Sequence, residues 1–194
     1  MNNKFSFSTI VATCFGVGFV PFAPGTFGSL LAFPLYFILT YLMIIIKGGI
    51  SGLASPDLIN SILVINVGLF FLGAWAVDTY SRNTSKQDPK EVVIDEVVGQ
   101  LLTICLVVLL LPYIGGEALQ KIEKLGISPF NFALLNLLFA FIFFRIFDIS
   151  KPWPINYIDK KYKNALGVMF DDVLAAIFAV FVHFFVLYAI IDRI

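Results

Sequence analysis

Two pairs of adjacent carboxylates are the residues of this 194-residue chain best suited to chemistry, because each pair directly precedes a long apolar run. Asp95-Glu96 stands before one run and Asp171-Asp172 before another. A single acid in a first helical turn is explained by capping and by the helix dipole, worth about 0.3–1 kcal/mol. Two adjacent acids point about 100° apart on a helix, so one can cap while the other faces inward.

Clustered carboxylates repel one another unless a cation joins them. Ligand sets made only of oxygen suit Mg²⁺. The two pairs therefore predict a divalent-metal site formed by Asp95, Glu96, Asp171 and Asp172.

Two further polar segments carry groups that could hold a phosphate. Residues 24–29, Pro-Gly-Thr-Phe-Gly-Ser, are typical of a turn into a helix, where free N–H groups and the hydroxyls of Thr26 and Ser29 could bind an anion. Ser and Thr are also ordinary N-caps, and the segment lacks the Gly-Lys-Ser/Thr of a nucleotide P-loop. In the second segment, Arg145, Asp148 and Lys151 precede a Pro-Trp-Pro. Arg145 and Lys151 could clamp a phosphate, although each alone would be an ordinary interfacial charge.

The composition indicates that the elements positioning these residues lie in a membrane. The chain is 59% hydrophobic and 13% charged, with a mean hydropathy of +0.93, which is too apolar for a soluble domain. Its length fits one domain over residues 1–194. Thirteen basic and thirteen acidic residues balance, so nothing indicates nucleic-acid binding. Cys14 and Cys105 lie in apolar stretches and give no disulfide or metal framework.

Five apolar runs are long enough to cross a bilayer, which takes about 20 residues per helix. We expect an all-α, polytopic membrane helical bundle with these spans: Phe27–Ile46, Ile59–Val77, Val97–Ile114, Phe130–Phe147 and Val173–Ile191. The segment 5–22 is nearly long enough to add another. Its glycines and its Pro-rich end favour a half-buried or interfacial helix.

The basic residues divide unequally between the two sides that five spans define. Nine lie on the side of the polar segments, namely Lys4, Arg82, Lys86, Lys90, Arg145, Lys151, Lys160, Lys161 and Lys163, and four lie on the other, namely Lys47, Lys121, Lys124 and Arg193. The positive-inside rule makes the first side cytoplasmic. We therefore expect a multi-pass protein of the cytoplasmic (inner) membrane whose polar segments all face the cytoplasm.

Four motifs in order resemble those of the phosphatidylglycerophosphatase A family. They are Pro-Gly-Thr-Phe-Gly-Ser at 24–29, Ile-Asp-Glu-Val-Val-Gly-Gln at 94–100, Phe-Arg-Ile-Phe-Asp-Ile-Ser-Lys-Pro-Trp-Pro at 144–154 and Gly-Val-Met-Phe-Asp-Asp-Val-Leu-Ala at 167–175. The resemblance covers roughly residues 16 to 176. The segments Gly48–Pro56 and Gly115–Ser128 carry no such motif, and we expect them to be exterior loops.

The resemblance implies a Mg²⁺-dependent membrane phosphatase that converts phosphatidylglycerophosphate to phosphatidylglycerol and phosphate. The predicted catalytic residues are Asp95, Glu96, Asp148, Asp171 and Asp172, with Asp148 as base or additional ligand, and the predicted phosphate-binding residues are Thr26, Ser29, Arg145 and Lys151. Roles within the carboxylate set are not separable from the sequence, because a ligand and a general base are the same residue type.

Other catalytic designs fit the sequence less well. The single histidine, His183, lies within the last apolar run, so it is expected to pack between helices, and a histidine-nucleophile phosphatase would need two. The alternatives are an ion-coupled transporter, which would place acids near the bilayer midplane, a lipid-head-group transferase, whose Asp-Gly-x-x-Ala-Arg spacing is missing, and a structural membrane subunit. The oligomeric state stays open.

Overall fold

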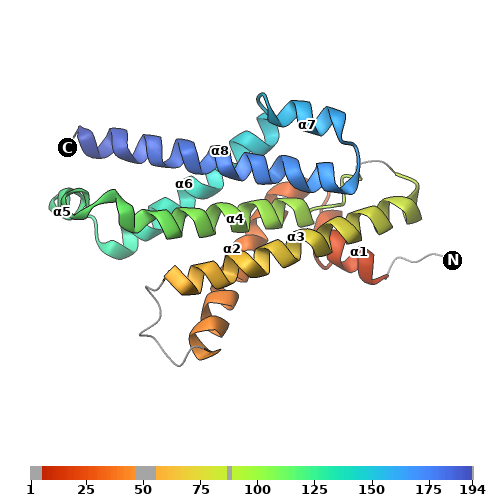
Figure 1. The fold of residues 1–194 in the computed structure, drawn as a ribbon, viewed down its shortest axis with the longest axis horizontal. Coiled ribbons are helices and arrows are strands. Elements are labelled where there is room, and N and C mark those ends of the chain that lie inside the picture. The colour runs from red at the N-terminus through yellow and green to blue at the C-terminus, as the bar shows by residue number, and fades with distance from the viewer. Residues whose placement is uncertain (1–5, 47–55, 87–88, 194) are drawn as a thin grey trace.

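In the parts of the chain that the structure describes, every regular element is helical (Figure 1). The computed structural model describes residues 6–46, 56–86 and 89–193. Lys4, Lys47 and all of the predicted loop Gly48–Pro56 except Pro56 lie outside these ranges.

Five helices of the described chain are long and apolar enough to cross a membrane, which confirms the predicted fold class. They are α2 (Pro24–Ile46), α3 (Pro56–Thr84), α4 (Ile94–Leu110, extended by the 3₁₀ turn η3, Leu111–Ile114), α6 (Pro129–Ser150) and α8 (Ala165–Asp192). The short helices are α1 (Phe7–Ala12), η1 (Val17–Phe19), α5 (Gly116–Lys124) and α7 (Ile155–Lys161). The predicted loop 115–128 therefore contains a helix, α5.

Helix α4 lies at the centre of the bundle and is the most buried of the five long helices. It packs against α2, α3, α6 and α8, and α3, α4 and α8 run side by side in Figure 1. Leu101, Ile104 and Cys105 are fully buried on α4, whereas large apolar side chains on the outer faces, such as Phe181 and Phe185, are exposed, as expected for surfaces that meet lipid.

Over the described residues 6–22, the chain forms no helix long enough to span a membrane. Ser6 caps α1 by accepting a hydrogen bond from the N–H of Thr9, and α1 packs on α3. The predicted half-buried helix over 5–22 is much shorter than expected, because Cys14, Phe15 and Gly16 have positive φ angles that end regular helix.

Several helices begin earlier or end later than the apolar runs suggest. Helix α8 starts at Ala165, where the Asn164 side chain accepts a hydrogen bond from the N–H of Gly167 at 2.9 Å. Asp171 and Asp172 therefore lie about two turns inside α8, and the expectation that they open this helix was wrong. Asp148 lies in the last turn of α6 instead of after it.

Candidate active site

The polar segments meet at a cavity of about 260 Å³ at one end of the bundle. It lies where α2, α4 and α8 begin and α6 ends, and α7 and the segment before α4 complete it. The described residues that line it are Pro24, Gly25, Pro89, Lys90, Val92, Asp95, Glu96, Asp148, Lys151, Asp159, Val168, Asp171 and Asp172. Six of these are carboxylates and two are lysines, so the chemistry of the cavity is that of acids and cations.

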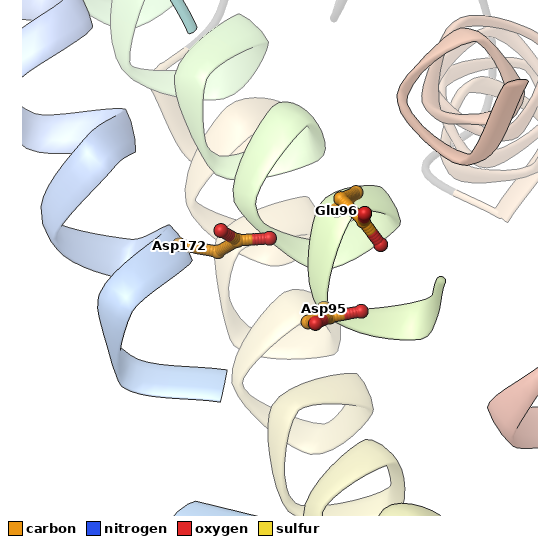
Figure 2. Close-up of side chains that lie close together, drawn as sticks. All are labelled: Asp95, Glu96 and Asp172. Atoms are coloured by element: carbon orange, nitrogen blue, oxygen red, sulfur yellow. The ribbon is translucent and has the colours of Figure 1, made fainter. Parts of the chain in front are cut away.

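Asp95, Glu96 and Asp172 form a carboxylate trio. Figure 2 shows Asp172 of α8 beside Asp95 and Glu96 in the first turn of α4. One oxygen of each lies within 4.8 Å of the others. Val93, the residue before α4, has an apolar side chain that cannot cap the helix, and neither acid of the pair at 95–96 serves as an N-cap residue.

Each member of the carboxylate trio has a buried oxygen with no hydrogen-bond partner among the described residues: Asp95 Oδ1, Glu96 Oε2 and Asp172 Oδ2. Asp172 is only 3% exposed. Buried carboxylate oxygens are costly unless they are paired or bind a metal. Carboxylate oxygens are the ligands that a hard divalent cation such as Mg²⁺ takes in proteins. Three of them lie within 4.8 Å of one another here, so the donor set fits a divalent cation.

Asp171 points to a different partner. Its Oδ2 accepts a hydrogen bond from Lys151 Nζ at 2.5 Å, and its Oδ1 accepts one from the N–H of Asp172. Lys151 follows the last residue of α6 in a left-handed conformation, with φ of 40°. Burial disfavours the ammonium, but hydrogen bonds and charge attraction from Asp159 and Asp171 outweigh it and hold the pKa of Lys151 above its usual range. Lys151 therefore stays cationic at neutral pH.

Arg145 connects α6 to the start of α2. It pairs with Asp148, and its Nη1 donates to Ser29 Oγ at 3.2 Å. Ser29 is fully buried and donates in turn to the carbonyl of Gly25 at 3.0 Å. Thr26 is half-buried and is not among the described residues that line the cavity.

Two glycines allow the helices to approach this closely. A Cβ on Gly25 would collide with the Glu96 carboxylate. A Cβ on Gly99 would lie 2.8 Å from the ring of Phe144 and 3.0 Å from the Cβ of Asp172. The backbones of α2 and α4 thus come near the carboxylates only because these positions have no side chain.

Sequence reasoning missed Asp159 and Lys90 in this cavity. Asp159 Oδ1 accepts a hydrogen bond from Lys151 Nζ at 2.6 Å. In the sequence Asp159 is one acid beside a group of lysines, which is typical of a solvated surface. Asp159 reaches the cavity only because the chain turns so that α7 packs back on α8. The spacing of residues in the sequence does not predict that turn.

The described cysteine and histidine side chains offer no nucleophile at the cavity. Cys14 is buried, and burial, with added repulsion from Asp95 and Glu96, raises the pKa of its thiol to about 12. His183 is buried between α6 and α8, where its Nε2 lies 2.8 Å from Asn136 Oδ1. The predicted packing role of His183 is confirmed.

The chain is similar to other proteins along most of its length. The family model for phosphatidylglycerophosphatase A matches residues 10–187. A phosphatidylglycerophosphatase A of Haemophilus influenzae is 32% identical over 92% of this chain and 88% of its own length. The corresponding Escherichia coli protein is 26% identical over 91% and 81%. A Bacteroides thetaiotaomicron protein, 31% identical over 88% and 87%, is named as a candidate phosphatidylinositol-3-phosphatase. No solved structure gives a significant match.

Proposed function

The chain belongs to the phosphatidylglycerophosphatase A family of lipid phosphatases, and we propose that it hydrolyses phosphatidylglycerophosphate to phosphatidylglycerol and inorganic phosphate. The observation that carries the proposal is the carboxylate trio in one cavity with the paired cation Lys151, next to Arg145, which pairs with the cavity-lining Asp148. A phosphomonoester needs cations around its oxygens and an activated water, and this set of groups suits both needs.

We assign Mg²⁺ to the carboxylate trio. The support is the chemistry of the three carboxylates and their unpaired buried oxygens. When bound, Mg²⁺ supplies Lewis-acid polarisation of the phosphoryl group and makes water more acidic. Asp171, which the sequence predicts as a fourth ligand, is held by Lys151, and its role as a ligand stays a prediction.

Arg145 and Lys151 are the proposed phosphate-binding groups. Both are cations held by carboxylates, so each is oriented before a phosphate arrives. Ser29 orients Arg145 through the hydrogen bond to Nη1. As water attacks phosphorus and the bond to the glycerol oxygen breaks, negative charge moves onto that oxygen, and these cations stabilise the non-bridging oxygens.

Asp148 is the proposed base. It lines the cavity and is mostly buried, with its side chain 11% exposed. It would take a proton from the attacking water while Arg145 keeps it in place. The leaving glycerol oxygen takes up a proton, so that ester and water give alcohol and phosphate.

We propose that the cavity faces the cytoplasm at the surface of the inner membrane. Helix α8 has 28 residues, or about 42 Å, against a hydrocarbon core of about 30 Å. Its first two turns, which carry Asp172, can therefore extend to the head groups. An ion-coupled transporter would instead hold its acids near the midplane, and the nine basic residues predicted on this side favour the cytoplasm.

The test is phosphate release by the purified protein from phosphatidylglycerophosphate, phosphatidic acid and phosphatidylinositol-3-phosphate. We expect the first substrate to be hydrolysed at least about tenfold faster than the others, and we expect activity to disappear with excess chelator and return with Mg²⁺. Activity that survives chelation would exclude the metal assignment. Faster release from another lipid would reassign the substrate.

A further inference from the structure

Lys151 is held by two carboxylates that come from different helices. Its Nζ lies 2.5 Å from Asp171 Oδ2 on α8 and 2.6 Å from Asp159 Oδ1 on α7. All three residues line the cavity. We infer that Asp159 is a positioning residue for the phosphatase reaction, which with Asp171 fixes the Lys151 ammonium so that it binds a phosphate oxygen of the substrate.

The geometry of an ammonium group supports this role. Lysine has three N–H donors and a flexible four-carbon stem, so a single carboxylate leaves the nitrogen free to swing. Within the described structure two carboxylates take two of the three donors, and the third can serve a ligand. Asp171 sits on a long helix packed against α4 and α6. Asp159 supplies the second anchor.

Asp159 is not needed to hold α7 in place. Helix α7 packs along α8, and Ile155 in its first turn is fully buried with Phe144 and Ala175. Apolar burial of a side chain of this size contributes about 1.5–3 kcal/mol. The Asp159 carboxylate is 35% exposed, so its bond to Lys151 adds little to that anchoring. Its effect is therefore expected in phosphate binding more than in folding.

The experiment compares Asp159→Ala, Asp159→Glu, Lys151→Met and the double variant Lys151→Met/Asp159→Ala in steady-state hydrolysis of phosphatidylglycerophosphate. Alanine keeps helix propensity high in α7.

Asp78→Ala is the matched control, because Asp78 pairs with Arg82 at 2.8 Å on the exposed face of α3. We expect Asp159→Ala to lower kcat/KM about tenfold, mainly through KM, since charge-assisted hydrogen bonds have about this effect. Asp159→Glu should recover most of the loss, and Asp78→Ala should change kcat/KM less than about twofold.

The double variant separates positioning from structure. If Asp159 acts through Lys151, adding Asp159→Ala to Lys151→Met changes kcat/KM less than about twofold. An equal tenfold loss in both backgrounds, or an unchanged KM in Asp159→Ala, would overturn the inference.

Because the inference rests on the proposed function for the identity of the substrate, binding of inorganic phosphate in Mg²⁺ is measured by calorimetry on the same variants. A wild type that releases no phosphate from the lipid overturns the proposed function alone. The inference then stands if Asp159→Ala weakens phosphate binding about tenfold, and falls if that binding is unchanged.

Discussion

The acids around the cavity divide into two kinds according to whether a cation holds them. Arg145 holds one and Lys151 holds two, and these three acids are Asp148, Asp159 and Asp171. The carboxylate trio of Asp95, Glu96 and Asp172 keeps buried oxygens that have no hydrogen-bond partner in the described chain. We propose that the first kind arranges the phosphate-binding groups, with Asp148 also acting as the base, and that the second binds metal.

This division predicts different effects for two neighbouring substitutions. Asp172→Asn removes a charged oxygen from the carboxylate trio, so we expect the Mg²⁺ concentration for half-maximal phosphate release to rise at least about tenfold. Asp171→Asn is the matched neighbour. It should raise KM for the lipid and leave the Mg²⁺ midpoint within about twofold. Equal shifts of the midpoint in both variants would instead support Asp171 as a fourth ligand.

The helices bring these residues together through close contact at positions that have no side chain. Gly99 of α4 lies against Phe144 of α6 and Asp172 of α8. The distance between α4 and α8 therefore sets the spacing of the carboxylate trio. A side chain that pushes α4 and α8 apart is therefore expected to lower both the stability of the protein and its affinity for the metal.

Gly99→Ala tests this contact. We expect it to lower the free energy of unfolding by about 1–3 kcal/mol, as overpacking does, and to reduce Mg²⁺-dependent turnover at least about tenfold. Gly68→Ala on α3 is the control, because an added Cβ there would meet no atom within 4 Å in the described part of the chain. It should be neutral or stabilising by up to about 1 kcal/mol. Denaturant unfolding of the detergent-solubilised protein measures the free energy of unfolding, and a separate assay of phosphate release by the folded protein measures turnover. Equal changes of both quantities in Gly99→Ala and Gly68→Ala would contradict the role of Gly99.

At the scale of the elements, apolar run length was enough to predict the five spans, because lipid requires about 20 apolar residues per helix. It did not locate the helix ends. The backbone of α8 stays helical from Ala165, through residues less apolar than the run itself. The members of the carboxylate trio were predictable because they belong to two pairs of adjacent acids in the sequence. The ion pair of Asp171 with Lys151 and the position of Asp159 at the cavity were not, because they depend on how the chain folds back after α6.

At the scale of the whole molecule, the cavity lies at one end of the bundle, and α5 follows the opposite end of α4. The two ends can therefore be assigned to sides of the membrane by labelling. Both cysteines are buried, and the raised pKa of Cys14 further lowers its reactivity. The wild type is thus a natural control that should take up little thiol reagent.

Lys163→Cys and Lys124→Cys place exposed thiols after α7 and at the end of α5, respectively. With a membrane-impermeant maleimide, we expect Lys124→Cys to be labelled in intact spheroplasts and Lys163→Cys in inside-out vesicles. The reverse pattern would put the cavity on the outer face and contradict the cytoplasmic assignment.

The hydrogen bond between Asn136 and His183 has a consequence for the alignment of the bundle. It is a polar contact between α6 and α8, and the buried contacts on either side of it are apolar. A slip of one helical turn, about 5.4 Å, would break this bond, which is worth about 0.6–2 kcal/mol in lipid. The same slip would carry Lys151, which follows α6, away from Asp171. The hydrogen bond of His183 therefore helps to fix the register of α6 against α8. Through that register, a contact in the interior of the bundle also fixes the position of Lys151 beside Asp171.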